Sequence, residues 1–282
     1  MNTSKKTILI GGNGMIGRCL VAKLPPNTVV TTSRHESGKR QLNLADFKTD
    51  NLKFIHSGDT VLLTAAISSP DICKQQPKLA YAVNVSGTKK LISHCLSQGA
   101  KVVFFSSDTV YGETTSPAKE SQALTPVGDY ARMKANVEEH FHDTQNFLAL
   151  RLSYVISKQD KFTHYLSECA DKNRSADLFH PLLRNAVWIG DLLEVIINLT
   201  KKWPTTLHTL NIGGPTPISR IDIADAFSRQ YSPLLTYNIT KPTADFYSAR
   251  PVNIFMNIEQ LTHYLGRKPY NVDTAYLKEL KG

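Results

Sequence analysis

The sequence has little that is typical of a membrane, metal-binding or disulfide-linked protein. It contains no apolar run of about 18 residues, which a membrane-spanning helix would need. Its four cysteines lie far apart and form no Cys-x-x-Cys pair, so we expect reduced thiols in a cytoplasmic protein. The nine histidines are also dispersed, and no metal site is indicated.

Basic tracts with interleaved aromatic residues are missing as well, so a nucleic-acid surface is not expected. The net charge is +9, but the Lys and Arg residues are scattered, and this mild excess suits anionic small molecules. With 282 residues, 41% of them hydrophobic, the chain is long enough for one large domain or for a domain plus a smaller lobe.

A glycine-rich turn follows the first expected strand, residues 6–10. Glycines spaced three apart between a strand and a helix allow a tight turn, close approach of a pyrophosphate and packing of the helix on the sheet. The N–H groups at the start of such a helix also favour a phosphate. We therefore predict dinucleotide binding rather than a turn without a ligand, by the residues Gly11, Asn13, Gly14, Met15, Ile16 and Gly17.

The second expected strand, residues 28–32, ends without an acidic residue. A carboxylate at this point would accept a hydrogen bond from the ribose 2′-hydroxyl of NAD and would repel a 2′-phosphate. The sequence instead has Ser33 and Arg34, which would bind a 2′-phosphate. We therefore favour NADP (NADPH) over NAD, the alternative being that Arg34 is only a surface residue.

Two further segments are expected beside the cofactor. Asn43 and Leu44 could reach the adenine edge, and the small residues Ala65 and Ala66 follow a strand over residues 59–64, where the backbone could lie close to the ribose and phosphates. Asn84 lies on an expected helix over residues 79–97, where it could bond to the active-site strand or serve the structure alone.

A proton-transfer site is predicted from the next strand and helix. The segment from Lys101 to Gly112 begins with a short apolar strand that ends in hydroxyls. Tyr130 and Lys134 lie four residues apart, on one face of the helix that follows. We expect the ammonium group of Lys134 to lower the pKa of Tyr130, so that the phenol can give a proton to a carbonyl whose oxygen Ser107 holds. The alternative is that Tyr-x-x-x-Lys arises here by chance.

Strands alternate with helices along the chain, which predicts an α/β fold with a doubly wound parallel sheet. In such sheets ligands bind at the carboxyl ends of the strands, where the glycine turn, Ala65–Ala66 and Ser107 all fall. We assign residues 1–157, with 185–213 returning to them, to a dinucleotide-binding domain, and 158–184 and 214–282 to a smaller mixed α/β substrate-binding lobe.

Together, Gly11-x-x-Gly14-x-x-Gly17, Ser107–Gly112 and Tyr130-x-x-x-Lys134 resemble the extended short-chain dehydrogenases/reductases of the NAD-dependent epimerase/dehydratase superfamily. Residues 213–220 and 249–253 resemble its dTDP-4-dehydrorhamnose reductase branch. The resemblance implies a Rossmann-type fold, with Ser107 bonding a carbonyl, Tyr130 as general acid and Lys134 holding the phenol and a ribose. Residues 152–158 match the branch only in part, and 159–162 lack its Gly/Asn pattern.

The candidate substrate-binding residues are Asp108, Tyr154, Arg184 and Arg250. Arg250 precedes a proline, which keeps its backbone extended, and its guanidinium fork suits a diphosphate. An ion pair between lobes is the alternative for Arg250 and for Arg184. Ser219 opens a helix as an N-cap.

The favoured function is NAD(P)H-dependent reduction of a keto group on a nucleotide-activated deoxysugar, by hydride transfer with Tyr130 as general acid. One alternative is a nucleotide-sugar epimerase or dehydratase that recycles its cofactor. Another is a non-catalytic NAD(P)-binding regulatory subunit. The expected partner is the nucleotide-sugar substrate, and no membrane or nucleic-acid partner is expected. Whether the protein forms a homodimer is left open.

Overall fold

The computed structural model describes residues 5–33 and 39–281. The described chain divides into two compact units. The first comprises the residues up to Val110, Gly128–Arg151 and Ile196–Leu210. The second comprises Tyr111–Val127, Leu152–Val195 and the chain from Asn211 on. Within the described residues, no helix combines the length and the apolar character that crossing a bilayer requires.

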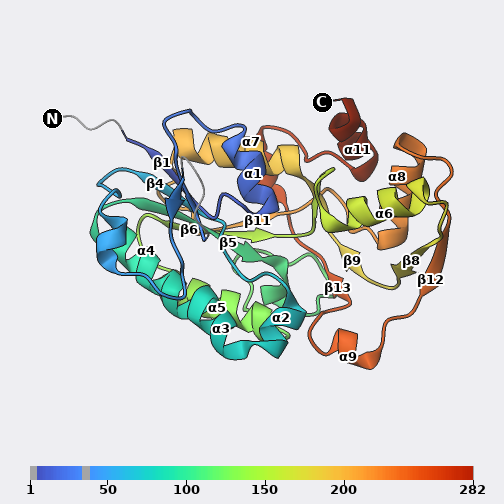
Figure 1. The fold of residues 1–282 in the computed structure, drawn as a ribbon, viewed down its shortest axis with the longest axis horizontal. Helices are drawn as coiled ribbons and strands as arrows, with labels where there is room; N and C mark the ends of the chain where they lie inside the picture. Colours follow the sequence, from blue (N-terminus) through green and yellow to red (C-terminus); the bar gives the residue numbers. More distant parts are fainter. Residues whose placement is uncertain (1–4, 34–38, 282) are drawn as a thin grey trace. The chain divides into compact units, whose positions relative to one another are not determined.

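The first unit is built on a seven-stranded sheet with the order β11-β6-β5-β4-β1-β2-β3 (Figure 1). Strand β1 pairs in parallel with β2 and with β4, and β4 pairs in parallel with β5. These parallel pairs and the helices between them confirm the predicted Rossmann-type α/β fold. The strands are β1 (Thr7–Ile10), β2 (Val29–Thr32), β3 (Arg40–Gln41), β4 (Thr60–Leu63), β5 (Lys101–Ser107), β6 (Phe147–Leu152) and β11 (Thr209–Ile212).

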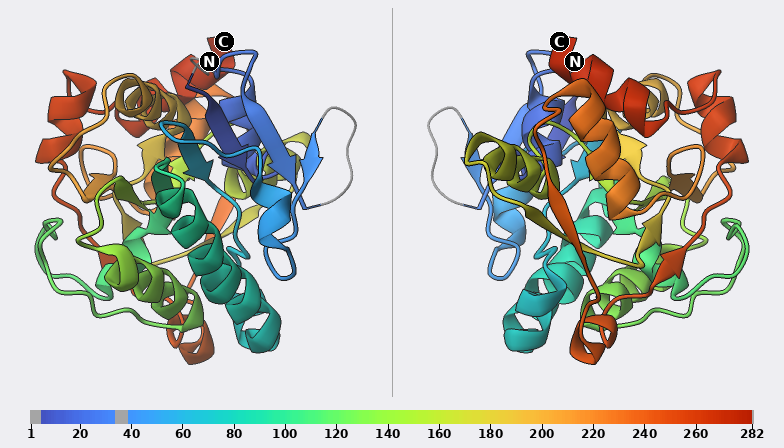
Figure 2. Two further views of the ribbon diagram at one scale, coloured as in Figure 1. Left: turned by 90° about the vertical axis from the view of Figure 1, so that its left-hand side faces the viewer. Right: turned by 90° about the vertical axis from the view of Figure 1, so that its right-hand side faces the viewer.

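Helices lie on both faces of this sheet (Figure 2). Helix α1 covers one face, and α4 and α5 cover the other. The helical elements up to residue 141 are α1 (Met15–Val21), η1 (Thr49–Leu52), α2 (Pro70–Gln75), α3 (Pro77–Tyr81), η2 (Ala82–Gly87), α4 (Thr88–Ser97), η3 (Asp108–Tyr111) and α5 (Asp129–Phe141).

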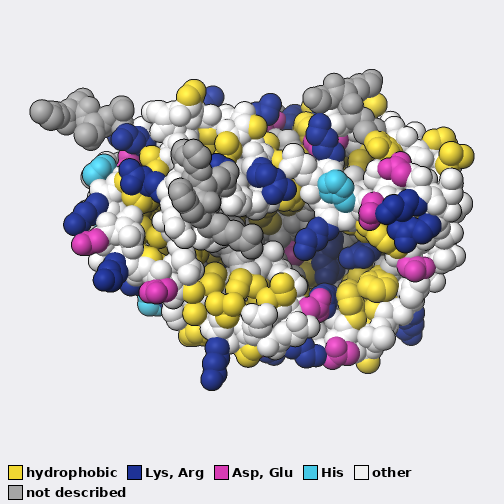
Figure 3. All heavy atoms as spheres, in the orientation of Figure 1, with side chains coloured by type: hydrophobic (Ala, Val, Ile, Leu, Met, Phe, Trp, Pro, Cys, Tyr) yellow, Lys and Arg dark blue, Asp and Glu magenta, His cyan; other side chains and the backbone are white. Residues whose placement is uncertain are grey.

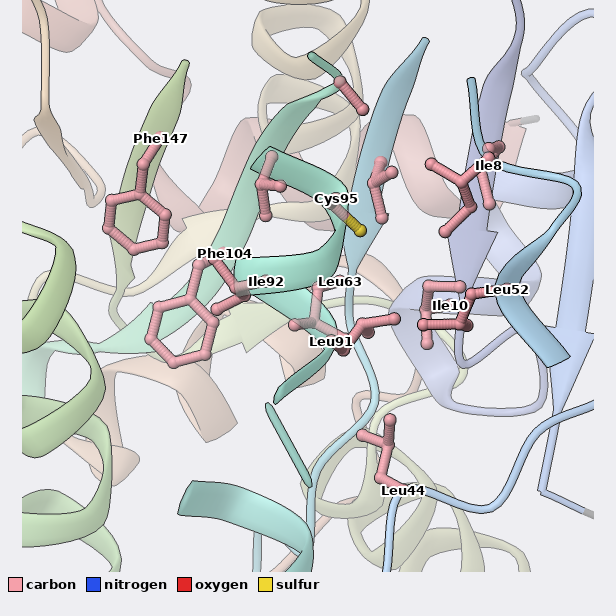
Figure 4. Packing of buried hydrophobic residues seen from close by; sticks show 14 of the residues in the cluster. Ile8, Ile10, Leu44, Leu52, Leu63, Leu91, Ile92, Cys95, Phe104 and Phe147 are labelled. Atoms are coloured by element: carbon pink, nitrogen blue, oxygen red, sulfur yellow. The ribbon is translucent and has the colours of Figure 1, made fainter. Parts of the chain in front are cut away.

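The core of the first unit lies between the sheet and α4 and α5. Ile8, Ile10, Leu63 and Phe104 of the strands pack with α4 residues such as Leu91, as Figure 4 shows. These side chains are at most 1% exposed. Because central strands of a parallel sheet are covered on both faces, they are continuously apolar, and β4 is buried along its whole length.

The second unit has its own core between α6, α8 and the parallel pair β8–β12. Phe162, Leu166, Leu178 and Phe227 are among its buried residues. The elements of this unit include β7 (Val155–Ile156), α6 (Lys161–Asp171), β8 (Ala176–Phe179), β9 (Leu183–Arg184), β10 (Val187–Trp188), α8 (Arg220–Gln230), β12 (Tyr237–Thr240), α9 (Ala244–Tyr247), β13 (Asn253–Ile254), α10 (Glu259–Leu265) and α11 (Val272–Lys281). Helix α7 (Ile189–Lys201) has residues in both units.

Candidate active site

The glycine turn after β1 has the tight geometry that its spacing predicts. Gly11 has a φ of +103°, and a Cβ added there would lie 2.7 Å from the backbone nitrogen of Ala65. A Cβ on Gly17 would lie 2.2 Å from the carbonyl oxygen of Gly11, so α1 packs directly on the turn. At Gly14 the nearest atom would be 3.7 Å away, and no side chain caps the start of α1. The turn therefore presents bare backbone at the helix start.

A groove of about 270 Å³ lies beside this turn, within the first unit. It is bounded by the ends of β1, β2 and β4, and no carboxylate is among its described lining residues, which are Ile10, Gly11, Asn13, Gly14, Thr32, Ser33, Leu42, Asn43, Leu44, Thr64, Ala65, Ala66, Ile67 and Val83. Most of the predicted cofactor-binding residues are in this set. Met15, Ile16 and Gly17 form the first turn of α1 instead, and Arg34 lies outside the described residues. The cofactor role of each residue stays a prediction.

These features fit a dinucleotide. The groove has side-chain-free backbone where a pyrophosphate would lie and small residues along one wall, and none of its described lining residues carries a negative charge that would repel phosphates. Dinucleotides bind in such crevices at the carboxyl ends of parallel strands.

Ser107 ends β5 and is held by its neighbours. Its Oγ accepts hydrogen bonds from Thr109 Oγ1 at 2.9 Å and from the Thr109 backbone nitrogen at 3.3 Å. It donates to Asp108 Oδ1 at 3.3 Å. Ser107 and Asp108 are both buried. Since two donors occupy the acceptor sites of the hydroxyl, Ser107 can act on a further group only by giving it the proton that now points to Asp108.

Helix α5 places Tyr130 and Lys134 on the face that contacts β5. Lys134 Nζ donates to the carbonyl oxygen of Phe105 at 2.7 Å, two residues before Ser107. The same nitrogen lies 4.6 Å from the ring centroid of Phe104 and 5.8 Å from that of Tyr130. The structure therefore brings Lys134 to Tyr130 and to the end of the strand that carries Ser107.

The pKa of Tyr130 moves in the direction opposite to the one expected from the sequence. Burial raises it above the ordinary value for a phenol, and the negative charge of Asp108 adds to this effect. Burial also lowers the pKa of Lys134 to about 8, against the opposing charge of Glu138. The expected lowering of the Tyr130 pKa is therefore wrong for this structure, in which burial and Asp108 outweigh the positive charge of Lys134. Tyr130 is a protonated phenol at neutral pH, as a proton donor should be.

Asn84 serves the loop after β4 rather than the active-site strand. Its amide accepts from the backbone nitrogen of Ile67 at 2.8 Å and donates to the Ile67 carbonyl oxygen at 2.9 Å. The residue is 1% exposed and lies on the π-helical segment η2. Asn84 thus fixes the loop that carries Ala65 and Ala66, which line the groove.

Three of the predicted substrate-binding residues lie in the second unit. Arg184 donates to the carbonyl oxygens of Leu183, Val252 and Pro251 at 2.6–2.9 Å, so it holds the backbone beside β13. The guanidinium carbon of Arg250 lies 4.4 Å from the ring centroid of Phe246. Tyr154 donates its hydroxyl to Asp160, which caps α6. Whether these residues bind substrate stays a prediction.

One residue that the sequence did not single out is Arg220. It lines a cavity of about 510 Å³ together with Lys161, Phe162, Tyr165, Asp177, Phe179 and Thr240, all in the second unit. Its guanidinium carbon lies 4.9 Å from the ring centroid of Phe162 and 5.6 Å from that of Phe179. Burial lowers the pKa of Arg220, and the positive charges of Arg184 and Arg250 act in the same direction. The only sequence signal that could have pointed to Arg220 is its position directly after the N-cap residue Ser219.

Two of the curated relatives that match the chain have names with different functions. The chain is 26% identical to methionine adenosyltransferase 2 subunit beta of Xenopus tropicalis over 213 residues, which cover 70% of this chain and 63% of that protein. It is 25% identical to dTDP-4-dehydrorhamnose reductase of Mycolicibacterium smegmatis over 232 residues, which cover 79% of this chain and 68% of that protein. The chain thus spans about two thirds of the length of these relatives.

Solved structures share the fold over nearly the whole chain. A dTDP-4-dehydrorhamnose reductase from Bacillus anthracis in complex with NADP superposes with a TM-score of 0.82 at 16% identity, covering 98% of this chain and 99% of that one. A UDP-glucuronic acid 4-epimerase from Bacillus cereus in complex with NAD gives 0.81 at 18% identity, covering 98% of each chain. At these identities the likeness concerns the fold. A family model described as the RmlD substrate binding domain matches residues 5–279, and the chain therefore belongs to this family.

Proposed function

We propose that the protein is an NAD(P)H-dependent oxidoreductase that reduces a keto group on a nucleotide-activated deoxysugar. The observation that carries the proposal is the contact of Lys134 with the Phe105 carbonyl at 2.7 Å, beside Tyr130 and at the end of the strand that carries Ser107. This proton-transfer group and the glycine-lined groove belong to the same unit. The reaction converts a ketone, NAD(P)H and a proton into an alcohol and NAD(P)⁺.

Each residue has a distinct part in this reaction. The bound nicotinamide would supply the hydride. Tyr130, whose phenol is protonated at neutral pH, gives its proton to the carbonyl oxygen, and Ser107 donates a hydrogen bond to the same oxygen in place of its bond to Asp108. The positive charge of Lys134 stabilises the phenolate that remains.

The preference for NADPH over NADH belongs to this proposal. Its support is the absence of a carboxylate among the described residues that line the groove, together with the exposed Ser33 at the end of β2. A hydroxyl accommodates a 2′-phosphate, whereas a carboxylate would repel it. Titration of the protein with NADPH and NADH, followed by nicotinamide fluorescence, measures the preference directly.

The cavity around Arg220 is the proposed site of the nucleotide part of the substrate. It combines aromatic rings, which can stack on a base, with the guanidinium of Arg220 and the ammonium of Lys161, which attract a diphosphate. Isothermal titration with dTDP and UDP tests this assignment. Replacing Arg220 by Gln should weaken diphosphate binding at least tenfold, roughly the 1.5–3 kcal/mol of a charged hydrogen bond.

One assay tests the function itself. Purified protein is mixed with NADPH and a panel of dTDP- and UDP-linked 4-keto-hexoses, and the loss of reduced-nicotinamide absorbance is followed. Tyr130→Phe should reduce turnover by about 10²–10⁴-fold, the usual contribution of a positioned general acid. Its affinity for NADPH should be unchanged. A variant that keeps most of the activity would show that Tyr130 is not the proton donor.

A second candidate function is a cofactor-binding regulatory subunit, which is favoured by the relatives named methionine adenosyltransferase 2 subunit beta. A third is an epimerase that recycles its cofactor, as the name of one structural neighbour suggests. NADPH binding without turnover of any keto sugar would support the subunit. Sugar conversion without net NADPH consumption would support the epimerase.

A further inference from the structure

A buried carboxylate, Glu138, joins three elements beneath the candidate active site. It lies on α5 one turn beyond Lys134 and is 3% exposed. Ser106 of β5 donates its hydroxyl to Oε1, and Arg151 of β6 donates to Oε2 from Nε at 2.9 Å and from Nη2 at 2.8 Å. Both partners are also buried, at 3% and 5% exposure.

Folding alone does not call for this arrangement. Taking a carboxylate and a guanidinium out of water costs several kcal/mol per ion, and buried ion pairs often stabilise a protein no more than apolar side chains of similar volume. What the pair does provide is a fixed orientation, since the carboxylate of Glu138 is held from β5 and from β6 at once.

The segment that Glu138 holds is the one on which the proton-transfer site is built. Ser106 precedes Ser107, and Phe105, one residue earlier, accepts the hydrogen bond from Lys134. The helix that carries Glu138 also carries Tyr130 and Lys134. A shift of α5 along β5 would therefore separate Lys134 from its carbonyl and would move Tyr130 relative to Ser107 at the same time.

We propose that Glu138 is a positioning residue: it locks α5 to the end of β5, so that Tyr130, Lys134 and Ser107 stay in register, and its charge keeps Lys134 an ammonium ion. The proposal rests on the proposed function for its kinetic consequence only. It goes beyond the proposed function in assigning a role to a buried residue whose carboxylate is held by Ser106 and Arg151.

The charges around Lys134 support the electrostatic half of this role. Burial favours the neutral amine, while the carboxylate of Glu138 on the same helix favours the ammonium ion. Cys73 on α2 acts in the same direction only as a thiolate, and burial raises the pKa of its thiol. Arg151 on β6 is paired with Glu138, and Asp108 after β5 acts on Tyr130. Glu138 is the strongest of the groups that hold the charge on Lys134, so its removal should lower the pKa of Lys134 below about 8.

The test compares Glu138→Gln with Glu139→Gln, which removes the same charge from an exposed neighbouring position of α5. In protein labelled with ¹³C-lysine, the Lys134 signal is identified by its loss in Lys134→Met and titrated by NMR. We expect a lower pKa for Lys134 in Glu138→Gln and an unchanged one in Glu139→Gln. A Lys134 titration in Glu138→Gln identical to that of the wild type would overturn the proposal.

Steady-state kinetics test whether Glu138 positions the proton-transfer groups. Glu138→Gln should lower kcat for NADPH-dependent reduction by about 10²-fold, the cost of a displacement of roughly 1 Å in an active site, with little change in KM. Glu139→Gln should match the wild type. A Glu138→Gln enzyme with wild-type kcat would contradict the positional role. If the wild type turns over no keto sugar, the proposed function fails, whereas the NMR titration still decides the role of Glu138.

A further variant covers the case in which Glu138→Gln does not fold because it leaves Arg151 buried without its partner. The double variant Glu138→Gln/Arg151→Met removes both charges and leaves none unpaired. Its Lys134 should still titrate at lower pH than in the wild type, because Glu138 lies one turn from Lys134 on the same helix. A wild-type titration of Lys134 in this folded double variant would equally overturn the proposal.

Discussion

Lys134 couples the proposed chemistry to stability at the scale of a single residue. Its pKa is lowered to about 8 in the folded protein, so between this value and about 10.5 the unfolded chain binds more protons. Stability therefore rises with pH across this window, and the cost of charging the buried amine is fully present below pH 8. With each pKa unit worth 1.36 kcal/mol, the cost is about 3 kcal/mol at pH 7.

Lys134→Met should therefore be more stable than the wild type at neutral pH while losing activity. The gain in unfolding free energy, measured by urea denaturation at pH 7, should be at most about 3 kcal/mol, since the bond to the Phe105 carbonyl is also lost. The difference between variant and wild type should shrink as the pH rises from 8 to 10. A difference that does not vary with pH would show that the amine is not buried as the structure has it.

Thr109 offers a finer test of the Ser107 hydroxyl. Thr109→Val keeps the shape of the side chain but removes the donor that lies 2.9 Å from Ser107 Oγ. Loss of one neutral hydrogen bond should lower kcat roughly two- to tenfold, with no change in NADPH affinity. Thr109→Ser retains the donor and serves as the matched control. Equal losses in both variants would count against a role for the hydroxyl.

The residue types of the proton-transfer site could be predicted from the sequence, whereas their electrostatics could not. Tyr130 and Lys134 share a helix face because of their spacing alone. The direction of the Tyr130 pKa depends on burial and on Asp108, both of which arise only when the chain folds. Arg220 was overlooked for a similar reason, because its aromatic neighbours come from α6 and β8.

At the scale of elements, the turn into α1 contains a glycine that packing requires, Gly17, and a glycine that only the proposed cofactor would require, Gly14. Gly17→Ala places a Cβ 2.2 Å from the Gly11 carbonyl, so we expect a loss of about 1–3 kcal/mol of stability from overpacking. Gly14→Ala has 3.7 Å of clearance and a backbone φ of −66°, which alanine adopts freely. It should keep the wild-type melting temperature while binding NADPH at least tenfold more weakly.

Thermal melting and NADPH titration of both variants check this pair of outcomes. If Gly14→Ala binds NADPH as tightly as the wild type, the turn does not contact the cofactor. If Gly17→Ala melts at the wild-type temperature, α1 does not pack on the turn as closely as the structure shows.

The observed helix and strand boundaries agree with the predicted ones where local sequence signals mark them. They differ where tertiary contacts determine the backbone conformation. The helix expected over residues 79–97 does end at Ser97, but α3 and α4 are joined by the π-helical η2. Gly87 of η2 lies against the Leu44 carbonyl, where a Cβ would approach to 1.8 Å. A contact with a segment more than forty positions earlier in the chain leaves no trace in the periodicity of the helix.

For the molecule as a whole, alternation of strands and helices was sufficient to predict the parallel sheet, while ligand binding at the carboxyl ends of its strands stays a prediction. The strand pairing of the second unit could not be predicted in the same way. Its parallel pair β8–β12 joins segments some sixty residues apart, and β12 is only partly buried, so neither strand has the continuous apolar run of a central strand.

The net charge of +9 and the cavity of the second unit, which two cations and one carboxylate line, lead to a prediction for the whole molecule. Figure 3 shows Lys and Arg side chains spread over the face that it depicts, with acidic side chains between them. A positively charged protein attracts an anionic nucleotide sugar, and salt screens this attraction over about 10 Å at 0.1 M. We expect kcat/KM for the sugar to fall steadily as NaCl is raised, because encounter with the substrate slows. Arg220→Gln should show a weaker dependence on salt than the wild type.

Arg229→Gln is the matched control, since it removes the same charge from the same helix at an exposed site, where Arg229 pairs with Asp273 at 2.8 Å. If Arg220 acts only through the net charge, both variants should lose the same part of the salt dependence. If it acts as a local contact for the diphosphate, only Arg220→Gln should lose it, and its KM should rise as well. A kcat/KM that does not change with salt in the wild type would show that charge does not guide the substrate to this protein.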